Sequence, residues 1–177
     1  MTGGIACGKS LLSRYLNELG VATLDADDIV HDLIPDPAER RRLAAEVFAD
    51  PEKRKALEAR LHQQVLARIT AWFDGTDGTT GTDGTKIAII PLLFEARWEQ
   101  FFDIICTVAS SREKQIERMT ATRGYSREEA EARLAAQLPV AAKAEKSHYV
   151  IANDGTAADL RKEAERFVNW LKEKEHG

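Results

Sequence analysis

The stretch Gly3-Gly4-Ile5-Ala6-Cys7-Gly8-Lys9-Ser10 satisfies the pattern G-x-x-x-x-G-K-[ST], and a helical pattern follows it directly. Glycines at these positions let the backbone turn tightly and aim successive N–H groups at phosphate oxygens. The helix behind the loop adds its positive N-terminal end. Lys9 can reach the β- and γ-phosphates of ATP, and the Ser10 hydroxyl can be a ligand of Mg²⁺. A chance match is expected in roughly one random chain in a hundred of this length, so the sequence predicts a nucleotide-binding loop.

The start of the chain lacks a part that such a loop requires. The loop should follow a strand, yet only Met1 and Thr2 precede it. That strand is normally central in the sheet, and its absence would leave buried ladder groups unpaired. Either the first strand is missing, or the true reading frame begins further upstream, which we favour. An in-frame run of apolar codons upstream would confirm the second interpretation, and a stop codon there would contradict it.

The rest of the chain alternates short apolar runs with helical patterns. We expect strands over 21–24, 87–90, 104–109 and 149–151, and helices over 9–19, within 36–72, over 112–123, from a Ser126/Glu129 capping box to about 137, and in a final amphipathic segment that carries Leu160 to Leu171. Strands with near-continuous apolar cores, separated by helices, indicate an α/β fold with a parallel sheet covered by helices on both faces. We see no interdomain linker, so residues 1–177 are expected to form one domain. The Gly-, Asp- and Thr-rich stretch at 74–85 is expected to be a flexible loop.

Composition excludes several classes of protein. The chain has 177 residues, 44% hydrophobic and 31% charged, with a net charge of −4, which suits one globular domain and argues against broad nucleic-acid binding. The longest apolar run, 87–94, is far shorter than the ~20 residues of a membrane helix. The N-terminus lacks the apolar core of a signal peptide. Cys7 and Cys106 form no CxxC pair, which suits a reducing cytoplasm. The four histidines show no metal-ligand spacing.

Two acids follow the second expected strand. Asp25 and Asp27 lie at its carboxyl end, the edge where ligands gather in open α/β sheets. A carboxylate there can accept the proton of a hydroxyl that attacks the γ-phosphate, or help to hold Mg²⁺. Asp also favours helix N-caps, so from position alone a cap and a catalytic acid are about equally good interpretations.

Taken together, the segments TGGIACGKS, LGVATLDADDIVHDLI, PLLFEARW, RGYSREEAEARLAAQ and YVIANDG resemble dephospho-CoA kinase, in the right order and over nearly the whole chain. The loop alone is generic to many nucleotide-binding proteins, whereas the DAD, PLLFE and R-G-x-S-x-E-E-A-x-x-R-x-x-x-Q segments are far more specific. The resemblance implies an enzyme that transfers the γ-phosphate of ATP, with Mg²⁺, to the ribose 3′-hydroxyl of dephospho-CoA to give coenzyme A. It implies a three-layer P-loop kinase fold with a helical substrate-side region, here about 28–72, and a mobile lid, here about 112–147. Its partners would be small molecules, ATP and dephospho-CoA, with no nucleic acid and no membrane.

The resemblance also assigns roles to single residues. Asp27 would be the catalytic base, with Lys9 on the phosphates and Asp25 as a metal or orienting partner. The other residues implied are Gly4, Ala6, Cys7, Gly8, Lys9, Ser10 and Leu11 around the ATP phosphates, Arg118, Arg123 and Arg133 as lid arginines, Asn153 and Gly155 beside the adenine, Arg40, Leu93, Phe94 and Glu95 on the acceptor side, and Ser10 on the metal.

Each assignment has a local alternative. For any one lid arginine, the sequence alone favours a solvated or i,i+4-paired helix charge over a phosphate contact. Leu92, Leu93 and Phe94 can be core residues. Lys143, Glu145 and Lys146 are expected on a solvated helix face.

The chain departs from the family pattern at several positions. Ala6, Cys7 and Leu11 stand where the family commonly has Gly, Ser and Thr. If position 6 needs a positive φ, alanine there costs on the order of 1 kcal/mol. The stretch between HDLI and PDPAERRRL is much shorter than in the family, which affects acceptor binding more than ATP binding. Two other functions therefore stay open at this point: a kinase for another small acceptor such as a nucleoside monophosphate, and a non-catalytic nucleotide-binding relic.

Overall fold

The computed structural model describes residues 1–76 and 84–175, which divide into two compact units. Unit 1 consists of Met1–Thr23 and Ile89–Gly177, and unit 2 of Leu24–Ala88. The flexible loop expected at 74–85 falls mostly on residues 77–83, outside the described ranges. The expectation of one kinase domain over the whole chain stays a prediction.

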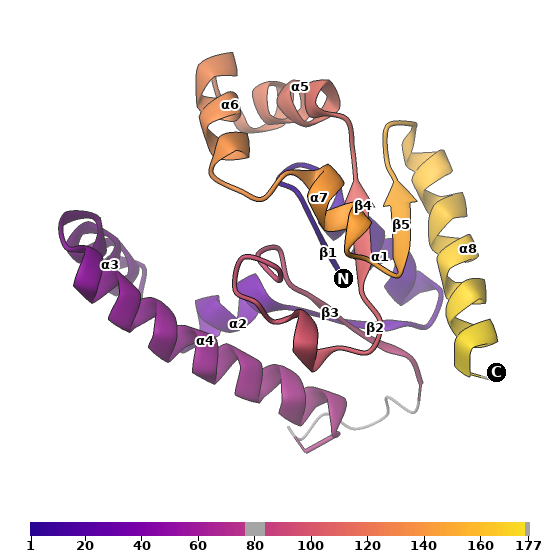
Figure 1. Cartoon of the computed structure of the whole chain (residues 1–177), viewed down its shortest axis with the longest axis horizontal. Helices are drawn as coiled ribbons and strands as arrows, with labels where there is room; N and C mark the ends of the chain where they lie inside the picture. Colours follow the sequence, from indigo (N-terminus) through magenta and orange to yellow (C-terminus); the bar gives the residue numbers. More distant parts are fainter. Residues whose placement is uncertain (77–83, 176–177) are drawn as a thin grey trace. The chain divides into compact units, whose positions relative to one another are not determined.

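The sheet of unit 1 is parallel and has the order β1-β4-β5 (Figure 1). Its strands are β1 (Thr2–Gly3), β4 (Cys106–Ala109) and β5 (Tyr149–Ala152). Thr2 pairs with Thr107, and Val108 pairs with Ile151. β4 is buried along most of its length, as expected for the central strand of a parallel sheet. The carboxyl ends of these three strands therefore lie together, and β1 leads there into the glycine-rich loop.

The expectation that the first strand is missing needs a correction. Thr2 and Gly3 form a short β1 against β4, and both residues are buried. Met1 extends this region, because its carbonyl accepts the Ile90 N–H at 2.8 Å. Two residues were too few to show as a strand in the sequence pattern.

Helices pack on both sides of this sheet. The helices of unit 1 are α1 (Lys9–Glu18), α5 (Arg112–Arg123), α6 (Arg127–Ala135), α7 (Val140–Glu145) and α8 (Ala157–Glu175). α7 packs on β4 and β1, and α8 packs on β5 and α1. In Figure 1, α7 lies in front of β4 and α1 lies behind it. The parallel sheet with helices on both faces is thus confirmed for unit 1.

Unit 2 is mostly helical. It holds α2 (Ala26–Leu33), α3 (Pro37–Ala49) and α4 (Pro51–Phe73), next to a two-stranded sheet of β2 (Ala22–Asp25) and β3 (Lys86–Ile89), whose outer ends lie in unit 1. Asp36 and Asp50 are the N-caps of α3 and α4, and proline occupies the first position of each helix. The helical region expected over 36–72 is confirmed, with a break at Asp50. A short 3₁₀ turn, η1 (Glu99–Phe101), follows in unit 1.

The core of unit 1 is made of the apolar faces that the sequence pattern predicts. Leu12 and Leu16 from α1, Val108 from β4, and Leu160 and Phe167 from α8 are almost completely buried. A second cluster of Ile116, Met119 and Ala130 holds α5 against α6, and the Ile5 and Ala6 side chains pack on it. No helix within the described residues is both long and apolar enough to cross a membrane.

Candidate phosphate-binding site

Side chains from other elements donate hydrogen bonds to carbonyl groups of the loop between β1 and α1. Asn153 Nδ2 donates to Cys7 O at 2.8 Å, and Gln115 Nε2 donates to Ile5 O at 2.6 Å. Arg118 NH1 donates to Ala6 O at 3.2 Å. These three donors come from β5's carboxyl end and from α5.

The first two carbonyls of the loop are held by its own lysine. Lys9 Nζ lies 3.0 Å from Gly3 O and 2.9 Å from Gly4 O. The ammonium is thus folded back over the loop. Transfer of Lys9 to a phosphate would exchange these carbonyl acceptors for stronger, charged ones.

Holding the carbonyls fixes the direction of the amides. In a planar trans peptide the N–H of one residue points opposite to the C=O of the residue before it. Each carbonyl from Gly3 to Cys7 accepts a side-chain donor, so the peptides that carry the Ala6 and Gly8 amides have a fixed orientation. The loop is therefore preorganised to present amides to an anion.

Three glycines make this arrangement sterically feasible. A Cβ on Gly3 would lie 2.4 Å from Val108 O, and one on Gly4 2.5 Å from Gln115 Nε2. A Cβ on Gly8 would lie 2.2 Å from Asn153 Nδ2, and Gly8 has a φ of 92°. A side chain at Gly4 or Gly8 would displace a donor that holds the loop, and one at Gly3 would clash with the backbone of β4.

Ala6 has a φ of 57°, in the left-handed region. From the sequence, alanine at position 6 is expected to be strained if the backbone there needs a positive φ. The structure has such a φ, so alanine at this position costs about 1 kcal/mol of stability. Cys7 is completely buried, and burial raises the pKa of its thiol. Its side chain faces the core, and its backbone carbonyl belongs to the held set.

α1 begins directly at the loop. Gly8 is its N-cap and provides no side-chain hydrogen bond, so the helix N-terminus is left to a ligand or to water. Ser10 is exposed in the first turn, and Leu11 is half-buried. An exposed hydroxyl at this position suits a ligand of Mg²⁺ that arrives with the nucleotide.

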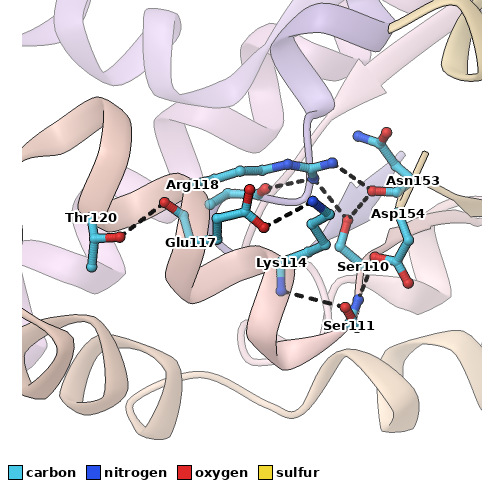
Figure 2. Close-up of polar contacts among 9 residues, drawn as sticks. Ser110, Ser111, Lys114, Glu117, Arg118, Thr120, Asn153 and Asp154 are labelled. Carbon is cyan, nitrogen blue, oxygen red and sulfur yellow. Dashed lines mark hydrogen bonds and ion pairs between the residues drawn. The ribbon is translucent and has the colours of Figure 1, made fainter. Parts of the chain in front are cut away.

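Arg118 and Asn153 form one network beside the loop (Figure 2). Arg118 NH2 donates to Asn153 O at 2.7 Å, and its NH1 donates to Ser110 Oγ at 3.0 Å. Ser110 Oγ in turn donates to Asn153 O at 2.7 Å. In this structure the guanidinium of Arg118 thus holds the loop, and the amide of Asn153 does the same from the other side.

The other two arginines of the expected lid are more exposed. The guanidinium of Arg133 lies over the ring of Tyr125, at 4.2 Å from its centre. Arg123 lies in the last turn of α5 and makes no hydrogen bond or ion pair with the residues that the structure describes. Gly155 lies in the turn before α8, where a Cβ would approach Asp159 Oδ2 to 2.8 Å.

Unit 2 carries the two acids. Asp25 ends β2 and caps α2 by accepting the Asp27 N–H at 2.9 Å, so the N-cap interpretation is confirmed for Asp25. Asp27 lies exposed in the first turn of α2. Within the described ranges its carboxylate accepts no hydrogen bond. Arg40 NH1 donates to Ile34 O at 2.6 Å and to Pro35 O at 3.1 Å, and so closes the turn between α2 and α3.

The residues of the PLLFE segment differ in exposure. Leu93 and Phe94 are buried, as the core interpretation predicts, whereas Leu92 is 46% exposed. Glu95 Oε1 lies 2.7 Å from Lys143 Nζ. The expectation of a solvated face was wrong for Lys143, which is completely buried on α7, while Glu145 and Lys146 are exposed. Its partner is 48 positions away along the chain, so no local pattern could reveal it.

Two glutamines, Gln115 and Gln137, bind the loop without having been predicted as site residues from the sequence. Gln115 is buried, and its role at Ile5 O has no signal in the sequence beyond its position on α5. Gln137 Oε1 accepts the Ile5 N–H at 3.0 Å. It is the last residue of the R-x-x-x-Q segment, which was noted as a motif without a role for its glutamine.

Comparison with known proteins agrees with this geometry. The family model of dephospho-CoA kinase matches residues 1–39 and 36–159. The chain belongs to the dephospho-CoA kinase family. A dephospho-CoA kinase of Geobacter sulfurreducens is 35% identical, over 97% of this chain and 96% of the relative, and one of Symbiobacterium thermophilum is 36% identical, over 93% and 77%.

Solved structures share the fold. A Thermus thermophilus protein has a TM-score of 0.76 and 32% identity, over 96% of this chain and 95% of its own. Dephospho-CoA kinase from Campylobacter jejuni has a TM-score of 0.71 and 25% identity, over 98% and 96%. Shikimate kinase from Acinetobacter baumannii, at 17% identity and a TM-score of 0.64, shares the fold alone.

The match to the family model is divided into two parts at the segment that the sequence predicts to be shorter than in the family. Its two parts meet at residues 36–39, directly after the HDLI segment. The position of the break fits the shorter segment that the sequence predicts. In this chain the turn closed by Arg40 occupies that position.

Proposed function

We propose that the protein transfers the γ-phosphate of ATP to the ribose 3′-hydroxyl of dephospho-CoA, giving ADP and coenzyme A. The observation that carries the proposal is the glycine-rich loop, whose carbonyls from Gly3 to Cys7 are all held by side chains. Such a loop has its amides in place before the phosphates arrive, and this preorganisation stabilises charge without a reorganisation cost. Membership of the dephospho-CoA kinase family supplies the acceptor.

The triphosphate would be bound by the Ala6 and Gly8 amides, the N-terminus of α1 and the Lys9 ammonium. Glycine at positions 3, 4 and 8 lets the β4 backbone, Gln115 and Asn153 approach the loop closely, and a loop held in this way fits such a group. Mg²⁺ would neutralise charge on the β- and γ-phosphates, with Ser10 as its protein ligand in this unit. The described residues hold no cluster of three or more His, Cys, Asp or Glu side chains suited to a metal.

Asp27 would orient the acceptor hydroxyl and take its proton. Its carboxylate is exposed in the first turn of α2 and takes no part in the N-cap, which the Asp25 side chain forms. Arg123 and Arg133 would contact the transferred phosphoryl group, because planar guanidinium groups bind phosphate oxygens in pairs. Arg40, Leu93 and Phe94 are proposed on the acceptor side, Asn153 and Gly155 near the adenine, and Cys7 and Leu11 along the loop. We also propose a cytoplasmic location, which the two buried free thiols, Cys7 and Cys106, fit.

The test is ADP release by purified protein with Mg·ATP and each of several acceptors. The proposal predicts rapid ADP release with dephospho-CoA and only background release with AMP, GMP or shikimate. Lys9→Ala should remain folded and lose the activity. ADP release with a nucleoside monophosphate in preference to dephospho-CoA would reassign the acceptor. Binding of Mg·ATP with no ADP release for any acceptor would favour a non-catalytic protein.

A further inference from the structure

The burial of the charged Lys143 side chain is unfavourable in free energy, so its place in the fold requires an explanation. Its side chain is completely buried. Removing an ammonium group from water costs several kcal/mol, even after the protein relaxes around it. Two apolar side chains of similar volume would stabilise a core at least as well. The buried charge therefore points to a role in geometry.

Both partners of Lys143 lie in the turn that follows β3, at residues 91–97. Its Nζ donates to Pro91 O at 2.8 Å and pairs with Glu95 Oε1 at 2.7 Å. Thr2 Oγ1 donates to the same Pro91 carbonyl at 3.2 Å, which ties this turn to β1. Lys143 thus neutralises the Glu95 carboxylate and fixes its position.

The same carboxylate oxygen holds the connector between α6 and α7, residues 136–139. Glu95 Oε1 accepts the Leu138 N–H at 3.0 Å. The neighbouring residue in the connector is Gln137, whose Oε1 accepts the Ile5 N–H of the phosphate loop at 3.0 Å. The connector is therefore tied on one side to the PLLFE turn and on the other side to the phosphate loop.

The bond from Gln137 matters most when Lys9 leaves the loop for a phosphate. The peptide between Gly4 and Ile5 is held at both ends, by Lys9 on Gly4 O and by Gln137 on Ile5 N. Once Lys9 moves to a phosphate, Gly4 O keeps only the longer bond from Cys7 N, at 3.3 Å. Gln137 then holds the peptide that precedes the phosphate-facing Ala6 amide.

We propose that Glu95, neutralised by the buried Lys143, is a positioning residue of the phosphate loop, which acts by fixing the connector that presents Gln137 to Ile5. Its side chain then serves the ATP site and not the acceptor. The proposal rests only on the ATP-binding part of the proposed function, so it is tested by binding of Mg·ATP without any acceptor.

Two matched double variants separate positioning from stability. Lys143→Met with Glu95→Gln removes both charges but keeps a side-chain oxygen for the Leu138 N–H. Lys143→Met with Glu95→Leu removes the same charges and the oxygen as well. Calorimetry of Mg·ATP binding should give near wild-type affinity for the first variant. The second should bind about five-fold more weakly, the factor that one neutral hydrogen bond represents.

Gln137→Met provides an independent measurement that leaves the buried pair intact. It should also weaken Mg·ATP binding about five-fold, with a melting temperature close to wild type. Added to Lys143→Met with Glu95→Leu, it should cause little further loss, because both changes break the same connection. Gln63→Met and Lys162→Met, at exposed positions on α4 and α8, are the controls and should bind like wild type.

The outcomes are distinct. Wild-type affinity in Gln137→Met, equal affinities in the two double variants, or affinities that follow only the melting temperatures would each overturn the positioning role. If a double variant does not fold, Gln137→Met alone decides. A wild-type chain that does not bind Mg·ATP would overturn the proposed function together with this inference.

Discussion

Ala6 combines a left-handed φ of 57° with a side chain that packs on the cluster between α5 and α6. Glycine removes the steric strain at this φ but loses the small contact of the methyl group. We predict that Ala6→Gly raises the free energy of unfolding by about 1 kcal/mol.

Chemical denaturation checks this prediction against a control of opposite sign. Ala132, exposed within α6, has an ordinary helical environment. Ala132→Gly should lower the free energy of unfolding by about 1 kcal/mol. A less stable Ala6→Gly variant would show that packing outweighs the strain at position 6.

Asp27 is the residue whose chemical role is most open to a direct test. Asp27→Asn removes the proton acceptor with almost no change in shape. A general base contributes typically 10²–10⁴-fold, so we predict a fall in turnover of at least about a hundredfold, with little change in the affinity for Mg·ATP.

The control is Asp28→Asn, the neighbouring exposed acid in the same helical turn. It should turn over dephospho-CoA at close to the wild-type rate. Equal turnover in Asp27→Asn and wild type would remove the assigned role of Asp27. An equal loss in both variants would point to the charge of the α2 N-terminus and not to one base.

At the scale of single residues, the sequence predicted the chemical role of a residue better than it predicted which side chains are buried. The G-x-x-x-x-G-K-S pattern located the loop, and the strain at Ala6 followed from its departure from glycine. The burial of Lys143 was not predicted, because a lysine is rarely buried unless an acid pairs with it. The acid that pairs with it, Glu95, lies in a distant part of the sequence. Gln137 was visible in the sequence as part of a motif. Its role as the hydrogen-bond acceptor of the Ile5 N–H is revealed only by the folded chain, which brings the two residues together.

At the scale of elements, α5 shows how a helix can organise a loop. Gln115 and Arg118 are three positions apart, so they lie on one face of α5 and reach the successive carbonyls of Ile5 and Ala6. Ser111 caps the N-terminus of α5, and its own backbone N–H donates to Asp154 Oδ1 at 2.8 Å. The helix is thereby fixed against the turn that carries Asn153.

The planar fork of Arg118 is required for this arrangement. One guanidinium bridges Ala6 O, Ser110 Oγ and Asn153 O, with donors in a fixed geometry that an ammonium cannot reproduce. We predict that Arg118→Lys weakens Mg·ATP binding by about tenfold, the loss of one to two hydrogen bonds.

Isothermal titration with Mg·ATP measures this effect, and Arg112→Lys, at the exposed start of α5, is the matched control. The control should bind like wild type. If Arg118→Lys also binds like wild type, the charge of Arg118 is sufficient and its fork geometry is unimportant.

Elements with strong local signals were predicted closely. The helix over 112–123 and the Ser126/Glu129 capping box were both confirmed, because caps and helical periodicity are local properties of the chain. β1 was not recognised, because a strand of two residues has no periodicity and is defined by its partner β4. The helix from Ser126 ends at Ala135, earlier than expected, and its last residues form the connector to α7.

At the scale of the whole molecule, the buried start of the chain couples stability to pH. Burial lowers the pKa of the Met1 α-amino group from 8.0 to about 6. Between these values the unfolded chain binds a proton that the folded chain does not. For the chain that begins at Met1, the free energy of unfolding therefore rises as the pH goes from 6 to 8, and this stability is lost as the pH falls again.

The full effect is about 3 kcal/mol, from two pKa units of about 1.4 kcal/mol each, and about 2 kcal/mol of it falls between pH 6 and pH 8. Urea denaturation at pH 6 and pH 8 measures it. The same chain with an acetylated N-terminus should lack this contribution, and the difference between the two chains isolates the amine from all other groups. Identical pH profiles for the two chains would contradict the prediction.

The relation between the chain and its relatives extends over nearly all of its length, yet the break in the family match falls within unit 2. Unit 1 keeps the complete phosphate loop and the side chains that hold it. The acceptor side, for which the sequence predicts a shorter segment than in other dephospho-CoA kinases, is thus the part of the proposal that most needs a test. The identity of the product, more than ATP consumption, therefore tests the account.

The most direct measurement is the position of the new phosphate in the product of the reaction with Mg·ATP and dephospho-CoA. Phosphorus NMR and mass spectrometry of the purified product should show one added phosphate, as a monoester on the ribose 3′-hydroxyl, which is coenzyme A. A phosphate at another position, or unchanged dephospho-CoA beside accumulating ADP, would contradict the proposed function.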